Sequence, residues 1–282
     1  MPGALFSKIL IISSLPETNN QTARNLHDWI EAANQSNGWG VSLEYQEVEN
    51  AVALISLLQY ETSRIRSSGL IPIIHIEAHG TETEDGIFLK DGSVVTWQKL
   101  HPYLTALNVA TKLNLILILG LCSGAHFAAH MIPSDRSPCW LLIGPKSTVN
   151  DLHLKDCFIE FYREILNSGN GNLALQIINE STAYGSANTF FTPTAESFFK
   201  ATYRRYLAEL CTVDTCRARA QKIWEGLDGS MFPRPNQETI TLELIANKGV
   251  FFDIHKRNFF MIDLYEENND RFMITYEQIN EN

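Results

Sequence analysis

Two apolar stretches decide the fold of this chain: IPIIHIEAHG, residues 71–80, and LILILGLCSG, residues 115–124. Each is a continuous apolar run of strand length, which is typical of strands buried on both faces of a parallel sheet. The first run leads to His79 and the second to Cys122, and a glycine follows closely in both. Because functional groups collect at the carboxyl ends of parallel strands, we expect the imidazole and the thiol to meet at one sheet edge, as a cysteine nucleophile requires.

The chain around these stretches alternates between strand and helix patterns. A buried strand is expected at 8–13, a strand with alternating polarity at 41–45, and helices at 22–34, 51–66 and 97–107. Asp91-Gly92 lies between two β-rich runs, 87–90 and 93–96, and predicts a hairpin. This order predicts an α/β fold with a mostly parallel sheet and helices on both faces.

The remaining sequence predicts more helices and a final third of different character. We expect a helix directly behind Cys122 at 124–131, a strand at 138–144, and helices at 151–168, 173–181, 192–210 and 215–227. Residues 249–254, 259–264 and 271–276 have the pattern of short strands, which predicts a C-terminal α/β extension. The expected division is 1–190 for the main domain and 191–282 for the extension.

Composition excludes several classes of protein. The 282 residues carry a formal net charge of −10, which argues against a nucleic-acid partner, and no apolar run is long enough to span a membrane. Five cysteines without the spacing of a small disulfide scaffold indicate a reducing compartment. The first apolar run lacks a basic leader and a cleavage site, so we interpret it as a strand and expect a cytoplasmic protein.

Cys122 and His79 each have an ordinary structural interpretation beside the functional one. A free cysteine is commonly a buried core residue, and a loop histidine is commonly just hydrogen-bonded. The Gly-x-Cys-x-Gly motif at a strand end favours a catalytic role for Cys122 over a structural one. The helix expected directly after it would offer unpaired N–H groups and a positive potential, both of which stabilise a thiolate. The pair is a stronger signal than either residue, since both fall at the same predicted edge.

Metal chemistry is the weaker interpretation of this region. His75, Glu77 and His79 share one strand face, but a catalytic metal needs a complete ligand set with an open position. His75-x-Glu77 together with Cys139 is partly similar to a zinc deaminase signature, in which a second cysteine would replace Leu142. We therefore expect no metal and no cofactor.

The arrangement of these motifs resembles the caspase-like cysteine peptidases of clan CD, and most of all their bacterial CHAT branch. The features that carry the resemblance are His79-Gly80 after the third strand, the hairpin at Asp91-Gly92, and Cys122 after the fourth strand. They cover roughly residues 7–185. Cys122 follows His79 by 43 positions, near the caspase spacing of about 50. Gly120 departs from the pattern, since metacaspases carry an acidic residue at that position.

The resemblance implies a role for each residue of the site. Cys122 would attack the scissile carbonyl, His79 would protonate the leaving amine, and the N–H groups of Gly80 and Cys122 would hold the oxyanion. The loops at 13–20 and 145–151 would shape the substrate pocket. Glu17 and Asp151 are then candidate acids for an Arg or Lys side chain of the substrate, and the ordinary alternative is that both are solvated loop charges.

The resemblance also implies a protein substrate and an activating protein partner, in bacterial antiviral defence or regulated cell death. Two other functions stay open. LGLCSG at 119–124 also resembles the nucleophile elbow of class I glutamine amidotransferases and DJ-1-like hydrolases, whose histidine follows the cysteine. The later histidines here are His126, His130, His153 and His255. A non-catalytic caspase-like interaction module is the third possibility.

Overall fold

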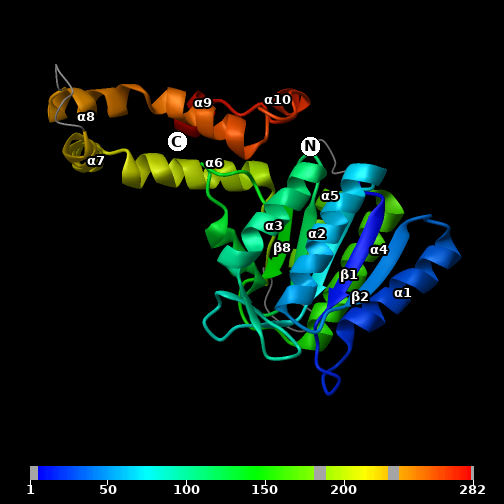
Figure 1. Cartoon of the computed structure of the whole chain (residues 1–282). Coiled ribbons are helices and arrows are strands. Elements are labelled where there is room, and N and C mark those ends of the chain that lie inside the picture. Colours follow the sequence, from blue (N-terminus) through cyan, green and yellow to red (C-terminus); the bar gives the residue numbers. More distant parts are fainter. Residues whose placement is uncertain (1–5, 181–188, 228–234, 281–282) are drawn as a thin grey trace. The chain divides into compact units, whose positions relative to one another are not determined.

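The structure, a computed structural model, describes residues 6–180, 189–227 and 235–280. The chain forms two compact units, one of residues 1–131 and 137–195 and the other of residues 132–136 and 196–282 (Figure 1). Among the described residues, no helix is long and apolar enough to cross a membrane. The first unit contains both stretches from which the sequence analysis started, so it holds the candidate site.

The first unit is built on a six-stranded sheet with the order β2-β1-β3-β7-β8-β9. The two central apolar stretches form β3 and β7, which are direct neighbours. All neighbours are parallel except β9, which is antiparallel to β8. The predicted mostly parallel sheet is therefore confirmed, and β9 is a strand that the pattern did not predict. The strands are β1 (Lys8–Ser13), β2 (Ser42–Glu47), β3 (Pro72–Glu77), β7 (Ile116–Gly120), β8 (Leu141–Pro145) and β9 (Phe190–Phe191).

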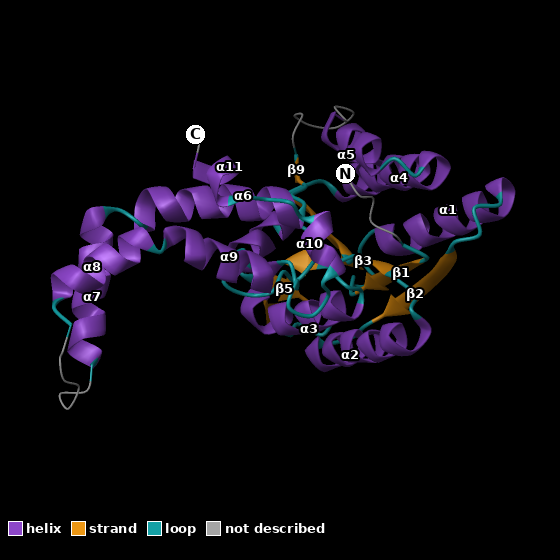
Figure 2. Ribbon diagram, turned by 90° about the horizontal axis from the view of Figure 1, so that it is seen from above, coloured by secondary structure: helices purple, strands orange, loops and turns teal. Residues whose placement is uncertain are grey.

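Helices cover both faces of this sheet, as predicted. Figure 2 shows α1 (Thr22–Asn37), α4 (Asp151–Ser168) and α5 (Gly171–Glu180) on one side, with α2 (Ala51–Ser68) and α3 (Trp97–Ala110) on the other. Ile9 and Ile11 of β1 share a core with Leu26 of α1 and Phe158 of α4. Side chains alternate along a strand, so Leu10, also fully buried, faces the opposite layer. Burial on both faces explains why these strands are apolar without alternation.

A small antiparallel sheet projects beyond the end of β3. It consists of β4 (His79–Gly80), β5 (Gly86–Phe88) and β6 (Val94–Thr96). The predicted hairpin between β5 and β6 is confirmed, and Gly92 in its turn has a φ of 88°, which favours glycine. His79 therefore lies at the junction between the large sheet and this ribbon.

The second unit has no strand among its described residues, only helices joined by turns and loops, so the expected C-terminal strands are wrong. Residues 249–254 and 259 lie in α9, and 271 and 276 lie in short helices. The reason is spacing: Phe252 and Phe259 are two helical turns apart, and both contact Phe199. Short aromatic runs do not distinguish strand from helix. The elements are α6 (Ala195–Arg205), the π-helix η2 (Tyr206–Leu210), α7 (Val213–Gly226), α8 (Gln237–Ala246), α9 (Lys248–Phe259), α10 (Glu267–Arg271) and α11 (Tyr276–Asn280).

The segment behind Cys122 also differs from the expectation. In place of a regular α-helix it forms a seven-residue 3₁₀ helix, η1 (Gly124–His130). A Cβ on Gly124 would lie 2.6 Å from the Leu119 carbonyl oxygen, and one on Gly144 would lie 2.7 Å from the Ala125 nitrogen. This close backbone packing holds η1 against the strand ends. Of the expected helix at 173–181, Ser181 lies outside the described residues, as do residues 181–185 of the family resemblance.

Candidate active site

The ends of β3 and β7 bring His79 and Cys122 to the same edge of the sheet. The two strands pair in parallel with Glu77 opposite Gly120, the last residue of each. His79 and Cys122 each come two residues later in the chain. The order of the strands in the sequence does not state which of them are neighbours in the sheet. Because β3 and β7 are neighbours, the two candidate residues lie side by side.

Gly80 fixes how closely the two strand ends approach. A Cβ on Gly80 would lie 2.2 Å from the carbonyl oxygen of Cys122, so only glycine fits against this backbone. Thr81 donates its N–H to Gly86 across the ribbon. Because N–H directions alternate along an antiparallel strand, the N–H of Gly80 points away from β5. The backbone next to His79 is thus packed directly on the backbone of Cys122.

A cavity of about 320 Å³ opens between these strand ends. The loop after β1 and the loop after β8, both expected to shape a substrate pocket, contribute to its wall. His79 and Cys122 both line it. The other lining residues are Leu15, Asn19, Asn20, Thr22, Glu77, Ala78, Gly120, Leu121, Val149, Asn150, Asp151 and Leu154.

His79 is partly buried and has a polar neighbour from the loop after β1. Its Nε2 lies 3.0 Å from Nδ2 of Asn19. An amide nitrogen donates, so Nε2 of His79 is the acceptor in this contact. The sequence analysis did not select Asn19, although the loop in which it lies was expected to form part of the pocket.

Cys122 is the partly exposed cysteine of the chain, and the other four are buried. Its Sγ lies 3.9 Å from the carbonyl oxygen of Val149. The next residue, Ser123, has a φ of 57°, a conformation that is uncommon for a residue with a side chain. Its hydroxyl donates to Oε1 of Glu84 at 2.8 Å, and Oε2 of Glu84 lies 3.1 Å from Nδ1 of His126. Glu84, which the sequence analysis missed, therefore holds the turn that follows the thiol.

The two acids expected in the substrate pocket have different positions. Glu17 does not line the cavity: its side chain is 90% exposed, and Lys90 Nζ lies 3.7 Å from its carboxylate. Asp151 does line it, at the first residue of α4, whose N-cap is Asn150. Asn20 donates to Asp151 at 2.6 Å, and this hydrogen bond holds the pKa of the Asp151 carboxyl below its ordinary value.

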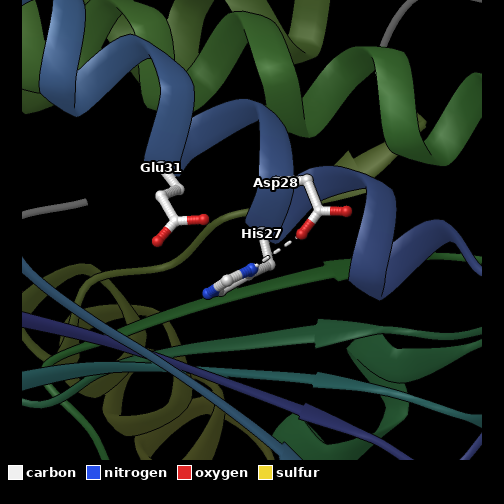
Figure 3. Close-up of side chains that lie close together, drawn as sticks. All are labelled: His27, Asp28 and Glu31. Atoms are coloured by element: carbon white, nitrogen blue, oxygen red, sulfur yellow. Dashed lines mark hydrogen bonds and ion pairs between the residues drawn. The ribbon is translucent and has the colours of Figure 1, made fainter.

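The metal interpretation of the β3 residues finds no geometric support. Within the described ranges, one group of three His or carboxylate side chains has its ligand atoms within 4.8 Å of one another, and it consists of His27, Asp28 and Glu31. Figure 3 shows these side chains on α1, where Nδ1 of His27 lies 3.0 Å from Oδ1 of Asp28. Both carboxylates are exposed, and exposed acidic groups of this kind are common without an ion.

Comparisons with known proteins give a distant likeness among solved structures. No family model matches the chain, and no curated protein matches it. Among solved structures, the crystal structure of the Drosophila initiator caspase Dronc is similar, with 16% sequence identity and a TM-score of 0.49. The match covers 68% of this chain and 81% of that chain. A likeness of this extent says nothing about activity, and the α/β class of the first unit rests on its own strand order.

Proposed function

We propose that this chain is a caspase-like cysteine endopeptidase with Cys122 as nucleophile and His79 as general acid and base. One observation carries the proposal: both side chains leave the carboxyl ends of adjacent parallel strands and line a single cavity. The other cysteines are buried, so Cys122 is the thiol that a substrate can reach. A strand-end nucleophile beside a strand-end base is the arrangement that covalent acyl transfer needs.

The chemistry follows from these positions. His79 takes the proton of the Cys122 thiol, and the resulting thiolate forms an S–C bond to the scissile carbonyl, whose π electrons move to oxygen. The N–H groups of Gly80 and Cys122 are the donors for this oxyanion, each worth about 2.7–4 kcal/mol. The C–N bond then breaks, and the leaving amine takes a proton from His79. Water adds to the thioester while His79 takes its proton, and the S–C bond breaks to release the acid and restore the thiolate.

The amidotransferase-like alternative needs a histidine that follows the cysteine. Of the later histidines, His126 is next to Glu84 and His153 is buried with its Nε2 3.5 Å from Cys157 Sγ. Neither lines the cavity that contains Cys122, and His130 does not line it either. His255 belongs to the second unit. This distribution favours the peptidase.

The finer parts of the proposal rest on the sequence resemblance alone. They are membership of the CHAT-like branch, a protein as substrate, and activation by a protein partner in defence. A non-catalytic interaction module with the same fold would keep the cavity but show no turnover.

The test is to replace each member of the pair in the full chain. We expect Cys122→Ala to abolish cleavage of a selected peptide, and His79→Ala to lower turnover at least ~10²-fold, the usual contribution of general acid–base help. An irreversible peptide-based cysteine trap should add one mass equivalent to the wild type and none to Cys122→Ala. Circular dichroism checks that both variants fold.

The matched control is His130→Ala, which changes a histidine that does not line the cavity. It should cleave at the wild-type rate. Near-normal cleavage by folded His79→Ala, with loss in His153→Ala or His255→Ala, would overturn the assignment in favour of an amidotransferase-like hydrolase. Absence of both cleavage and trapping in the wild type would favour the interaction module.

A further inference from the structure

The turn that contains the nucleophile has a serine at a position that usually requires glycine. The Leu121 carbonyl oxygen accepts from the N–H of Gly124 at 3.1 Å, so Cys122 and Ser123 are the central residues of a four-residue turn. Ser123 has a φ of 57° and a ψ of 23°, and a positive φ at this place in a turn is normally adopted by glycine or asparagine. Contacts from outside the turn must therefore hold the serine in this conformation.

Two loops supply these contacts. The N–H of Ser123 donates to the carbonyl oxygen of Ser147, in the loop after β8, at 3.2 Å. Ser123 is 4% exposed, and its hydroxyl donates to Oε1 of Glu84 at 2.8 Å. A buried hydroxyl that loses its acceptor is destabilising, so this hydrogen bond keeps the side chain in place. Glu84 lies between β4 and β5, so the segment that follows His79 holds the segment that follows Cys122.

The backbone of Glu84 is fixed independently of its side chain. Its N–H donates to the Thr81 carbonyl oxygen at 3.0 Å, and its own carbonyl oxygen accepts from Nε1 of Trp97 at 2.8 Å. Trp97 is 1% exposed and anchors this loop in the core. The Glu84 carboxylate also lies 3.1 Å from Nδ1 of His126. Replacing the Glu84 side chain therefore removes its contacts with Ser123 and His126 and leaves the backbone contacts of the loop in place.

The conformation of Ser123 decides how the peptide between Cys122 and Ser123 is oriented. If Ser123 relaxed to a negative φ while the turn stayed closed, this central peptide would flip, which is the difference between the two commonest turn types. The Cys122 carbonyl oxygen lies so close to Gly80 that a Cβ there would be 2.2 Å away. A flip would move this oxygen and change the contact between the two strand ends. Since the N–H groups of Gly80 and Cys122 are the proposed oxyanion donors, their alignment depends on this turn.

We propose that Glu84 is a positioning residue of the peptidase: by accepting the Ser123 hydroxyl, it keeps the turn in its left-handed form and the two oxyanion donors aligned. This inference rests on the proposed endopeptidase function. Glu84 is not among the described residues that line the cavity, so it acts through Ser123 and not by contact with the substrate. Its loss should therefore lower kcat and leave KM unchanged.

The experiment measures kcat and KM of full-chain variants on a selected peptide. Glu84→Ala should lower kcat by about 10- to 100-fold, the usual cost of misplacing catalytic groups by up to 1 Å. Ser123→Ala removes the same hydrogen bond from the other side and should lose as much. Glu84→Gln keeps an oxygen that accepts, so its kcat should stay within about 3-fold of wild type. The matched control, Glu82→Ala, changes an exposed acid of the same loop that does not line the cavity and should keep the wild-type kcat.

A second substitution separates positioning from a general structural role. Glycine adopts a positive φ without help, so in a Ser123→Gly background Glu84→Ala should change kcat by less than about 2-fold. Circular dichroism checks that each variant folds. An equal loss from Glu84→Ala in both backgrounds overturns the inference, as does wild-type kcat in folded Glu84→Ala, and both results leave the peptidase standing. Equal losses in Glu84→Gln and Glu84→Ala would assign the effect to His126 and also overturn it. A wild type without turnover overturns the proposed function, and this inference with it.

Discussion

Cys122 differs from the other four cysteines in its access to solvent. It is partly exposed, whereas Cys139, Cys157, Cys211 and Cys216 are buried. Burial also raises the pKa of the Cys139 thiol far above its ordinary value, which disfavours the reactive thiolate. We predict that limited iodoacetamide near neutral pH labels Cys122 first and Cys139 last, with rates at least ~10-fold apart.

Peptide mapping by mass spectrometry over a time course measures this order. Labelling in 6 M guanidinium is the control, since unfolding should make all five thiols react alike. Equal labelling of Cys122 and Cys139 in the folded chain would contradict the prediction. This result does not depend on the identity of the substrate, because it reports only exposure and thiolate formation.

Strands β1 and β2 are joined to helix α2 by a network of charges around a buried lysine. Lys8 is 1% exposed, and its Nζ lies 2.8 Å from Glu44 and 2.9 Å from Glu61. Arg64 of α2 donates two hydrogen bonds to Glu44. These hydrogen bonds from Arg64 are the main cause that lowers the pKa of Glu44 from 4.5 to about 2. The network connects the edge strand β2 to the layer formed by α2.

The Glu44 pKa gives a signed dependence of stability on pH. A carboxyl whose folded pKa is depressed stabilises the fold above its unfolded pKa, and this contribution is lost as pH falls from about 4.5 to about 2. We predict that Glu44→Gln lowers the free energy of unfolding by roughly 1.5–3 kcal/mol at pH 7 and by much less at pH 3. Urea unfolding at both pH values measures the difference.

The matched control for that experiment is Glu47→Gln on the same strand. Glu47 pairs with Arg24 where both side chains are about half exposed, so its loss should cost at most ~1 kcal/mol. The same destabilisation by Glu44→Gln at pH 3 and pH 7 would show that the network acts through packing and not through charge.

Each of the two units of the molecule has a core of its own. In the first unit, β-sheet isoleucines pack with α1 and α4. In the second, Phe199 of α6 is surrounded by aromatic rings, with centroids 5.1–5.7 Å away. Its neighbours are Tyr203, Phe252, Phe259 and Phe260. A side chain that joins α6 to α9 in this way is expected to be important for the stability of the second unit.

We predict that Phe199→Ala destabilises the second unit by about 3–5 kcal/mol, the usual cost of removing a buried phenylalanine. Hydrogen exchange followed by mass spectrometry should show faster exchange in α6 and α9, with β1, β3 and β7 retaining wild-type protection. Met273→Ala, which changes a side chain that is 75% exposed in the same unit, is the control and should leave exchange unchanged. Equal loss of protection in both units would show that they unfold together.

Local patterns in the sequence determined most of the sheet. Continuous apolar runs predicted β1, β3, β7 and β8, because strands buried on both faces have no polar side to alternate with. The Asp91-Gly92 pair predicted its hairpin, because few residue pairs adopt the turn that it needs. The edge rule for parallel strands predicted that His79 and Cys122 would be neighbours. The aromatic runs of the last third are short, so their period was ambiguous and the expected strands are helices.

Only the tertiary structure decided which polar side chains face the cavity. Glu17 lies in the loop after β1 and Asp151 begins α4, both at the expected edge. Lys90 lies beside Glu17 outside the cavity, whereas Asn20 and the start of α4 hold Asp151 in the cavity wall. Glu77 has the same pattern as any polar residue at a strand end. It lines the cavity where β7 places Gly120 opposite it, and Thr22 of α1 donates a hydrogen bond to its carboxylate. These contacts join residues that are far apart in the chain, and no local pattern encodes the direction in which such side chains point.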